Sequence, residues 1–305
     1  MSDRKYPQGH CHIEIQPGDA ETMKGGNTVR IVFAVDENYV MPLAASVQSI
    51  IECTPSCSEL EIAIISCNLS ASAQRKLLSS WGPVAEQVRF IDIDMSMVNK
   101  LPMPRAGWLS PATYARLFLP ELLPDSWQRI IYLDADTITL GPLAELWHMD
   151  LAGMPLAAIQ DLYIPYISSE EGVTAWQESG LSRDAKYFNA GVLLMDIGAL
   201  RRGGVFQRAL DYLGENSESV RWYDQEALNA AINGRFLVLD QTWNVMWYWF
   251  FSPIRDDAPQ IIQRARVRHF SGPEKPWIQN DEDSPWGTDM FFKYLDQTAW
   301  RGWRP

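Results

Sequence analysis

The stretch Arg129-Ile-Ile-Tyr-Leu-Asp-Ala-Asp136 carries the clearest information about the fold. It begins with an apolar run of the kind that is buried on both faces of a parallel sheet. Two aspartates, Asp134 and Asp136, follow directly after this run. Because ligands in open α/β sheets bind beyond the carboxyl ends of the strands, the stretch predicts a buried strand that ends at a ligand site.

Segments on both sides of this stretch alternate between strand and helix patterns. Short runs of β-branched and apolar residues predict strands at 30–35, 60–65, 88–93, 129–133, 155–159, 187–195 and 267–270. Apolar residues at helical spacing predict helices at 41–52, 71–81, 112–123, 200–213 and 223–233. This alternation predicts an α/β fold with a mixed, mainly parallel sheet that is flanked by helices.

The composition is that of a globular protein. Of the 305 residues, 47% are hydrophobic and 21% are charged. Residues 1–28 lack apolar periodicity, and we expect them to form a poorly ordered tail. The remainder contains no proline-rich or serine-rich linker. We therefore expect one mixed α/β domain over residues 29–277, with a C-terminal segment, residues 278–305, packed on or near it.

The charge and the cysteines narrow the class of protein. A net charge of −12 repels phosphate polyanions, and the densest basic stretch, residues 264–268, contains only three arginines. We therefore expect no nucleic-acid binding. No window approaches about 18 consecutive apolar residues, so we expect no membrane-spanning helix. The four cysteines include no CxxC pair and suit a reducing compartment, which predicts a cytoplasmic protein.

Acidic residues follow three of the predicted strands. Asp36, Asp134 and Asp161 each come at or just after a strand end, and we expect them to share one rim of the sheet. In an extended segment, residues i and i+2 project to the same side, so Asp134 and Asp136 can grip one hard cation such as Mg²⁺ or Mn²⁺. Any single aspartate has a simpler explanation, since Asp after a strand often begins a turn or caps a helix.

The Asp-x-Asp pattern also occurs at residues 92–94 and 281–283, so context must separate the three. Only Asp134 follows a fully apolar run. Residues 90–94 alternate like a half-buried strand, and residues 281–283 lie in a polar stretch. The sequence therefore favours the pair at Asp134 and Asp136 as the metal ligands.

His269 is the candidate for a third metal ligand among four histidines. It precedes Gly272 and Lys275, which suit close backbone approach and a phosphate charge respectively. An imidazole ligand favours Mn²⁺ over Mg²⁺. The alternative is that this histidine is structural or faces solvent.

Six blocks of sequence stand in a recognisable order. They are Phe33-Ala-Val-Asp-Glu-Asn-Tyr39, Thr113-Tyr-Ala-Arg-Leu117, Tyr132-Leu-Asp-Ala-Asp136, Tyr187-Phe-Asn-Ala-Gly-Val-Leu-Leu194, Asp224-Gln225 and His269-Phe-Ser-Gly-Pro-Glu-Lys-Pro-Trp277. On these blocks the chain resembles family 8 glycosyltransferases over residues 30–303, in particular bacterial lipooligosaccharide α-galactosyltransferases and, more distantly, glycogenin.

The resemblance implies a GT-A fold, a UDP-sugar donor, a Mn²⁺ cofactor and a set of site residues. Those matching the family's donor-binding positions are Ala34, Asp36 and Asn38 near uracil and ribose, Arg116 and Asn189 near the sugar, Ala135 within the Asp134 and Asp136 pair, and Gly272 and Lys275 at the diphosphate. Asp134, Asp136 and His269 match the metal ligands. Asp224 and Gln225 match positions at the donor sugar, and Asp161 matches one between donor and acceptor.

The implied reaction moves a hexose, glucose or galactose, from a UDP-sugar to a hydroxyl of a saccharide or small-molecule acceptor and forms an α-linkage. We favour front-face attack in which the departing phosphate takes the acceptor proton. Gln225, an uncharged amide, then steadies the oxocarbenium-like centre. Double displacement would instead need Asp161, Asp224 or Glu226 as a nucleophile. The competing functions are a nucleotide-sugar hydrolase and a catalytically silent UDP-sugar-binding protein.

Four features leave alternatives open. Glu226 stands where the family often has aspartate, so its role is open. The end of the chain, residues 300–305, has two tryptophans and two arginines, which permits at most weak peripheral membrane contact. Residues 243–251 are rich in aromatic side chains that suit either the core or an acceptor platform. Residues 163–180 are a further candidate for an acceptor-facing loop or lid.

Overall fold

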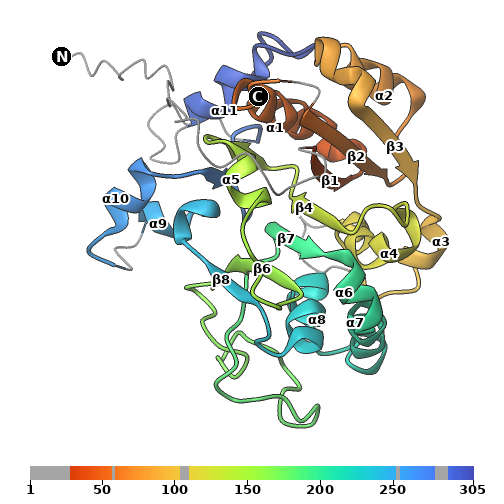
Figure 1. Cartoon of the computed structure of the whole chain (residues 1–305), viewed down its shortest axis with the longest axis vertical. Helices are drawn as coiled ribbons and strands as arrows, with labels where there is room; N and C mark the ends of the chain where they lie inside the picture. The colour runs from red at the N-terminus through yellow and green to blue at the C-terminus, as the bar shows by residue number, and fades with distance from the viewer. Residues whose placement is uncertain (1–27, 57–58, 104–109, 252–254, 279–287) are drawn as a thin grey trace, which may run out of the picture.

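The computed structural model describes residues 28–56, 59–103, 110–251, 255–278 and 288–305 (Figure 1). The strands are β1 (Val29–Val35), β2 (Leu60–Ser66), β3 (Val88–Asp92), β4 (Arg129–Leu133), β5 (Thr137–Thr139), β6 (Leu156–Ile159), β7 (Val192–Asp196), β8 (Leu237–Leu239) and β9 (Val267–His269). The α-helices are α1 (Val40–Glu52), α2 (Ala71–Leu78), α3 (Met95–Val98), α4 (Leu119–Leu122), α5 (Leu143–Trp147), α6 (Ile197–Arg202), α7 (Val205–Glu215), α8 (Tyr223–Ile232), α9 (Tyr248–Phe251), α10 (Ala258–Gln263) and α11 (Thr288–Leu295). The 3-10 helices are η1 (Glu37–Tyr39), η3 (Gly82–Gln87), η4 (Pro111–Phe118) and η5 (Gln241–Trp243).

The main sheet has seven strands in the order β3-β2-β1-β4-β7-β6-β8. Strand β7 runs antiparallel to both of its neighbours, and the other neighbouring pairs are parallel. The predicted mixed, mainly parallel sheet is therefore confirmed. The carboxyl ends of β1, β4 and β6 lie along the same edge of the sheet as the amino end of β7. That edge carries the site described below.

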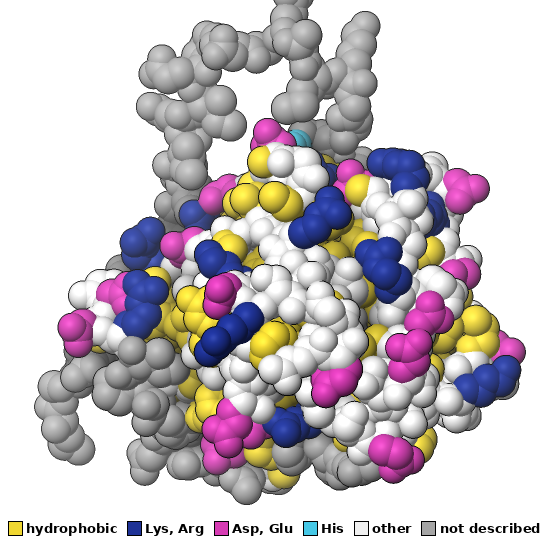
Figure 2. Space-filling view, turned by 90° about the horizontal axis from the view of Figure 1, so that it is seen from below, with side chains coloured by type: hydrophobic (Ala, Val, Ile, Leu, Met, Phe, Trp, Pro, Cys, Tyr) yellow, Lys and Arg dark blue, Asp and Glu magenta, His cyan; other side chains and the backbone are white. Residues whose placement is uncertain are grey.

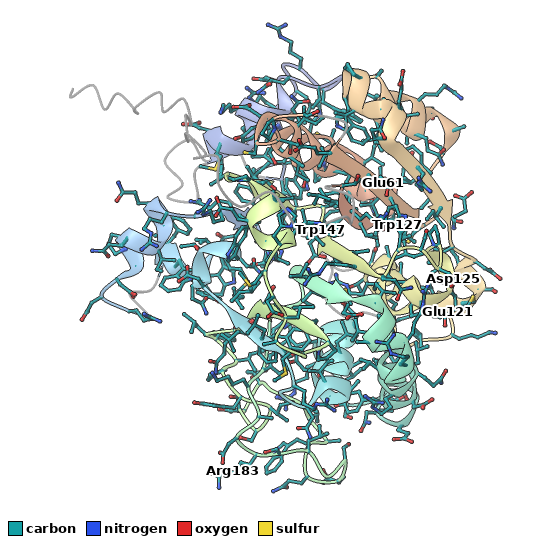
Figure 3. All side chains as sticks on the ribbon, in the orientation of Figure 1. Glu61, Glu121, Asp125, Trp127, Trp147 and Arg183 are labelled. Atoms are coloured by element: carbon teal, nitrogen blue, oxygen red, sulfur yellow. The ribbon has the colours of Figure 1, made fainter. Side chains whose placement is uncertain are left out.

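Both faces of the sheet are buried, because alternate residues of the central strands enter two different clusters. Val32 packs on one face among apolar residues of η4, α6, α7 and α8. Ile31 and Phe33 pack on the other face with α1, α2 and α5. Side chains fill the space on both sides of the strands (Figure 3). This arrangement explains why β1 and β4 read as nearly continuous apolar runs.

A second, two-stranded sheet brings distant parts of the chain together. Strands β5 and β9 pair antiparallel, with Thr137 opposite His269. Helix α11 packs against α1 in a third apolar cluster that includes Ala45, Phe270 and Phe291. The pairing of β5 with β9 places His269 beside the turn that carries Asp136.

Two predicted helices are wrong in extent. The helix predicted at 112–123 is the 3-10 segment η4 followed by the short α4, because Pro120 has no amide hydrogen to continue an α-helix. The helix predicted at 200–213 is split into α6 and α7. The break falls at Gly203 and Gly204, and Gly204 has a left-handed φ of 60°.

The strand predicted at 187–195 is also shorter than expected, because only its second half joins the sheet as β7. In the first half, alternate residues still bond to backbone, as the Asn189 amide does to the Ile159 carbonyl at 3.3 Å, and the residues between them bond to side-chain amides. Asn229 accepts from the Phe188 amide at 2.8 Å and donates to the Phe188 carbonyl at 2.8 Å. Gln225 accepts from the Ala190 amide at 2.9 Å. This irregular segment is therefore bound to α8.

Other expectations concern the surface and the ends of the chain. Among the described residues, none of the helices is long and apolar enough to cross a membrane. Lys and Arg side chains are interspersed with Asp and Glu on the face shown in Figure 2.

Two of the predictions concern residues that the structure does not describe. The predicted tail lies outside the described residues up to residue 27, and so do residues 281–283. In the second Asp-x-Asp pattern, at residues 92–94, Asp94 accepts a hydrogen bond from the Ser96 amide and caps α3. This aspartate therefore has the simpler role of a helix cap.

Candidate active site

A cleft of about 320 Å³ opens at the edge of the sheet where β4 and β6 end. A smaller pocket of about 90 Å³ lies beyond the end of β1. Both are lined by Tyr39, Thr113, Arg116, Asp134 and Asp136. The two pockets are therefore neighbouring parts of one site.

Nearly all of the predicted site residues line these two pockets. The larger one is lined by Arg116, Asp134, Asp136, Asp161, Asn189, Asp224, Gln225, His269, Gly272 and Lys275. The smaller one adds Ala34, Asp36 and Ala135. Asn38 lines neither pocket, and its amide hydrogen-bonds to Asp36 Oδ1 at 3.0 Å. Residues from six distant blocks thus converge on one cleft.

Asp134 and Asp136 lie in the turn between β4 and β5. The Asp134 carbonyl accepts from the Thr137 amide at 3.2 Å and from Thr137 Oγ1 at 2.8 Å. The expectation that an extended segment projects both carboxylates to one side is therefore wrong. The turn itself brings the two carboxylates together, and β5 then pairs with β9.

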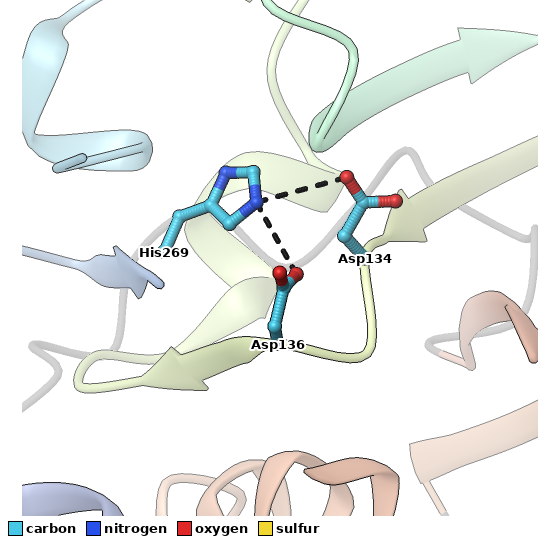
Figure 4. Close-up of side chains that lie close together, drawn as sticks. All are labelled: Asp134, Asp136 and His269. Carbon is cyan, nitrogen blue, oxygen red and sulfur yellow. Dashed lines mark ion pairs between the residues drawn. The ribbon is translucent and has the colours of Figure 1, made fainter. Parts of the chain in front are cut away.

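His269 completes a cluster of three possible metal ligands (Figure 4). Its Nε2 atom lies 3.2 Å from Asp136 Oδ1 and 3.7 Å from Asp134 Oδ2. One ligand atom from each of the three residues lies within 4.8 Å of the others. Two carboxylates and one imidazole form a donor set that suits a divalent ion such as Mn²⁺.

Asn244 fixes the orientation of the His269 ring. Its Oδ1 lies 3.0 Å from His269 Nδ1, and its Nδ2 donates to Asn189 Oδ1 at 2.9 Å. An acceptor at Nδ1 holds the proton on that nitrogen and leaves the Nε2 lone pair for a metal. The cluster therefore fits a bound cation. The sequence did not predict a role for Asn244, and its only signal there is one asparagine within the aromatic segment 243–251.

Gly191 is a second residue that the sequence analysis missed. A Cβ atom at this position would lie 2.3 Å from His269 Cε1 and 3.0 Å from Asp134 Oδ2. Only glycine leaves room for the imidazole and the carboxylate together. Gly272, which was predicted, has a φ of 89°, so this glycine is required by its left-handed backbone.

Two buried cations form ion pairs with three carboxylates of the cleft. Arg116 lies 2.6 Å from Asp134 and 2.9 Å from Asp224. Lys275 lies 2.5 Å from Asp136 and donates to the Phe270 carbonyl at 2.5 Å. Burial opposes these charges, but the two carboxylates still hold the pKa of Arg116 above its usual range.

The same pairing keeps Asp136 ionised. Burial alone would raise the pKa of Asp136, but Lys275 and His269 more than offset it and hold that pKa below its ordinary value. Asp224 is different, because burial outweighs Arg116 and raises its pKa. Thr113 Oγ1 donates to the Asp224 carboxylate.

Asp161 and Gln225 are held by the backbone around the cleft. Asp161 Oδ1 accepts from the amides of Tyr163 at 2.9 Å and Ile164 at 3.1 Å. Its Oδ2 lies 3.5 Å from Asn189 Nδ2. Burial raises the pKa of Asp161. Gln225 Oε1 accepts from the Ala190 amide, so both side chains have defined orientations in the lining of the cleft.

Glu226 does not line the cleft. Its buried carboxylate accepts hydrogen bonds from the backbone amides of Thr174, Arg221 and Trp222 and from the Tyr212 hydroxyl. These four donors tie the segment after β6 and the start of α8 to α7. The structure therefore gives Glu226 an architectural role, and it is not placed to act as a nucleophile.

The aromatic segment 243–251 divides between the two predicted roles. Trp243 and Trp249 are buried in the apolar cluster with α1 and α5, and Tyr248 belongs to this cluster but also lines the cleft. Trp247 lines the cleft, and so does Tyr163. The segment that contains Tyr163 follows β6. Arg183, which is labelled in Figure 3, belongs to this segment and lies away from the sheet.

Comparison with known proteins identifies the family. The model of glycosyl transferase family 8 matches residues 30–281. The chain belongs to family 8 of the glycosyltransferases. This assignment confirms the resemblance that the six sequence blocks carry.

Two individual relatives match along most of their length. The chain is 26% identical over 288 residues to lipopolysaccharide 1,2-glucosyltransferase of Escherichia coli K12, which covers 90% of this chain and 79% of that protein. It is 24% identical over 288 residues to general stress protein A of Bacillus subtilis 168, covering 91% of this chain and 96% of that protein.

A solved structure extends the likeness to three dimensions. It is the crystal structure of the galactosyltransferase LgtC in complex with donor and acceptor sugar analogues. The TM-score is 0.75 at 28% identity, and the match covers 88% of this chain and 96% of that chain. The family 8 chain described here therefore has the predicted GT-A glycosyltransferase fold.

Proposed function

We propose that this family 8 glycosyltransferase transfers glucose or galactose from a UDP-sugar to a hydroxyl of a saccharide or small-molecule acceptor, with retention and formation of an α-linkage. The observation that carries the proposal is the convergence of Asp134, Asp136 and His269 on the wall of a cleft that also holds Arg116 and Lys275. The proposed compartment is the cytoplasm, as the small number of cysteines predicts.

Asp134, Asp136 and His269 would hold one divalent ion, Mn²⁺ or alternatively Mg²⁺. When bound, the ion supplies positive charge for the diphosphate leaving group. Lys275 and Arg116 add fixed positive charge on the same wall. Because they are buried, their charges act in a low-dielectric environment and need little reorganisation as the phosphate develops charge. These groups explain how a chain with net charge −12 attracts a diphosphate.

The smaller pocket, with Ala34 and Asp36, is the proposed nucleoside end of the site, and Asn38 lies beside it. The larger pocket, with Asn189, Asp224 and Gln225, is the proposed sugar end. The shared wall between the two pockets then lies beside the diphosphate. This order along the cleft supports a UDP-sugar bound across the carboxyl ends of β1 and β4.

We propose front-face attack as the mechanism. The bond from the anomeric carbon to the phosphate oxygen breaks and a bond to the acceptor hydroxyl oxygen forms. The hydroxyl proton passes to the leaving phosphate. Gln225 is held by the Ala190 amide and is an uncharged group suited to steady the oxocarbenium-like centre. Asp161 is poorly suited as a nucleophile because both its oxygens accept hydrogen bonds.

A donor screen tests the proposed function. Purified protein is incubated with UDP-glucose, UDP-galactose or UDP-N-acetylglucosamine, with Mn²⁺ or with a chelator, and UDP release is followed with and without acceptor sugars. We expect metal-dependent transfer, with an α-anomer identified by NMR. Fast turnover of a UDP-sugar without acceptor would indicate a hydrolase. A trapped glycosyl group on a carboxylate would replace front-face attack with double displacement.

A further inference from the structure

A groove lined by arginines lies at the edge of the sheet opposite to the cleft. It consists of two cavities, of about 530 Å³ and about 330 Å³, which share Gly153 and Ala199 as lining residues. The arginines that line it are Arg129 and Arg202 in the larger cavity and Arg208 and Arg235 in the smaller one. We call these two connected cavities the arginine groove.

The paired strands β4 and β7 separate the arginine groove from the cleft. At one end of this pair Arg129 is opposite Asp196, and both residues line the groove. At the other end Leu133 is opposite Val192, next to the turn that carries Asp134. Strand β4 has five residues, so at about 3.3 Å per residue its two ends are about 13 Å apart. A ligand in the groove would therefore not overlap a nucleotide in the cleft.

The four arginines of the groove are not neutralised by carboxylates. None of them lies within 4.0 Å of a carboxylate oxygen of a described residue, whereas eight arginines elsewhere in the described part of the chain do. In a chain with a net charge of −12, this groove is therefore a local concentration of positive charge.

Backbone carbonyls hold two of these arginines in place. Arg129 donates to the carbonyls of Trp147 at 3.1 Å and Met149 at 2.8 Å. Arg208 donates to the Ala231 carbonyl at 3.1 Å. A carbonyl fixes a guanidinium without cancelling its charge. These side chains therefore lose less conformational freedom when an anion binds beside them.

The two aspartates of the groove leave an excess of positive charge. Asp196 Oδ1 accepts from the Ala199 amide at 2.7 Å, and Asp150 Oδ1 accepts from the Ala152 amide at 2.9 Å. Four arginines and two aspartates give the lining a formal charge of +2. A phosphate monoester carries nearly two negative charges at neutral pH, so its charge complements that of the groove. Guanidinium groups also match the geometry of phosphate oxygens.

We propose that the arginine groove binds a phosphate monoester, carried by a small molecule or by a lipid headgroup. Arg202 and Arg235 are exposed, and their side chains form no hydrogen bond or ion pair with the described residues. They would donate to the phosphate oxygens, while Arg129 and Arg208 add fixed positive charge. This site is separate from the donor cleft and does not depend on the function proposed for that cleft.

Phosphate binding by wild-type protein and three variants tests the groove. The variants are Arg202→Gln, the double variant Arg202→Gln/Arg235→Gln and the control Arg75→Gln. Arg75 lies on α2 and is also exposed and without an ion pair among the described residues, but it does not line the groove.

Two pairs of probes separate the possible sources of the phosphate. Calorimetry compares glucose 6-phosphate with glucose, and co-sedimentation compares vesicles that contain phosphatidic acid with vesicles of phosphatidylcholine alone. A chelator is present throughout, because a metal ion in the cleft would itself attract phosphate.

We expect wild-type protein to bind glucose 6-phosphate, the phosphatidic acid vesicles or both, and to bind neither glucose nor phosphatidylcholine. The probe that binds identifies the source. The double variant should bind at least about tenfold more weakly, because it loses two charged donors, and the single variant should be intermediate. Arg75→Gln should resemble wild type.

Three results would overturn the proposal. The first is that wild-type protein binds neither phosphate probe. The second is equal binding by wild type and the double variant, which would place the phosphate elsewhere, for example beside Lys275 in the cleft. The third is an equal loss in Arg75→Gln, which would indicate general attraction to positive charge. Thermal melting checks that the double variant is folded.

Discussion

At the scale of single residues, the site depends on contacts that leave little freedom. Gly191 leaves space for His269, and Asn244 sets the orientation of its ring. Both residues are adjacent to the cluster that we assign to the metal, and neither is a ligand. Substituting either residue therefore changes the geometry of the cluster and leaves all of its ligand atoms in place.

We predict that Gly191→Ala abolishes Mn²⁺-dependent UDP binding. The added methyl group would overlap His269 Cε1 at 2.3 Å, so the ring must move away from the carboxylates. Overpacking of this kind costs about 1–3 kcal/mol of stability, so the variant should still fold. Calorimetry measures Mn²⁺-dependent UDP binding, and denaturant unfolding measures the stability.

Gly214→Ala is the matched control, because nothing lies within 4 Å of a Cβ atom at that position. It lies within α7, where alanine is favoured over glycine by about 1 kcal/mol. We expect unchanged UDP binding and equal or higher stability. Normal UDP affinity in Gly191→Ala would show that the imidazole does not need its observed position.

Asn244→Ala should lower Mn²⁺ affinity by about 10- to 100-fold, as is typical when the partner of a ligating histidine is lost. The change leaves Asp134, Asp136 and His269 in place but removes the acceptor at His269 Nδ1. Competition of Mn²⁺ with a fluorescent chelator, in the presence of UDP, measures the loss. An affinity equal to that of wild type would argue against the role of Asn244.

At the scale of elements, the prediction from sequence succeeded where burial is continuous. Strands β1, β2 and β4 are long apolar runs between two packed layers, and their patterns are unambiguous. Strands β5 and β8 were not predicted, because a strand of three residues is too short to carry a detectable periodicity, whereas β9 was predicted. The prediction of a strand at 187–195 was wrong in its early part, because the amides of Phe188 and Ala190 bond to the side chains of Asn229 and Gln225 and not to a neighbouring strand.

The site was predictable to a similar degree. Asp134 and Asp136 follow a buried strand, and the six ordered blocks marked the other cleft residues. What the sequence could not supply was the turn geometry at Asp134, the packing of Gly191 against His269 and the burial of Asn244. These depend on contacts between residues far apart in the chain.

Glu226 provides a test at the element scale. We predict that Glu226→Gln destabilises the fold by about 2–4 kcal/mol. The glutamine NH2 group cannot accept the hydrogen bonds that one carboxylate oxygen accepts, so buried donors would be left facing other donors. Four such donors meet this side chain. Urea unfolding measures the loss. At a temperature where the variant is folded, its kcat should stay near that of wild type, and a loss of turnover there would restore Glu226 as a catalytic candidate.

At the scale of the whole molecule, a seven-stranded sheet buried on both faces holds the two pockets at one edge. The proposed metal ligands come from the turn after β4 and from β9, which are more than 100 residues apart in the sequence. Ligand binding there should therefore couple to global stability.

We predict that Mn²⁺ and UDP together raise the melting temperature. A ligand at 100 times its Kd adds about 2.7 kcal/mol to the free energy of unfolding. For a chain of 305 residues this corresponds to a rise of about 4 °C. Differential scanning fluorimetry should show the shift with both ligands and lose it on chelation. The same rise in His269→Ala would contradict the assigned site.

The most direct test of the central claim counts Mn²⁺ bound at the cluster. Electron paramagnetic resonance follows the free Mn²⁺ signal as the ion is added to protein and UDP, for wild type, Asp136→Asn and His269→Ala. The account predicts one tightly bound ion per wild-type chain and a large loss of affinity in both variants. Equal binding by all three proteins would contradict it.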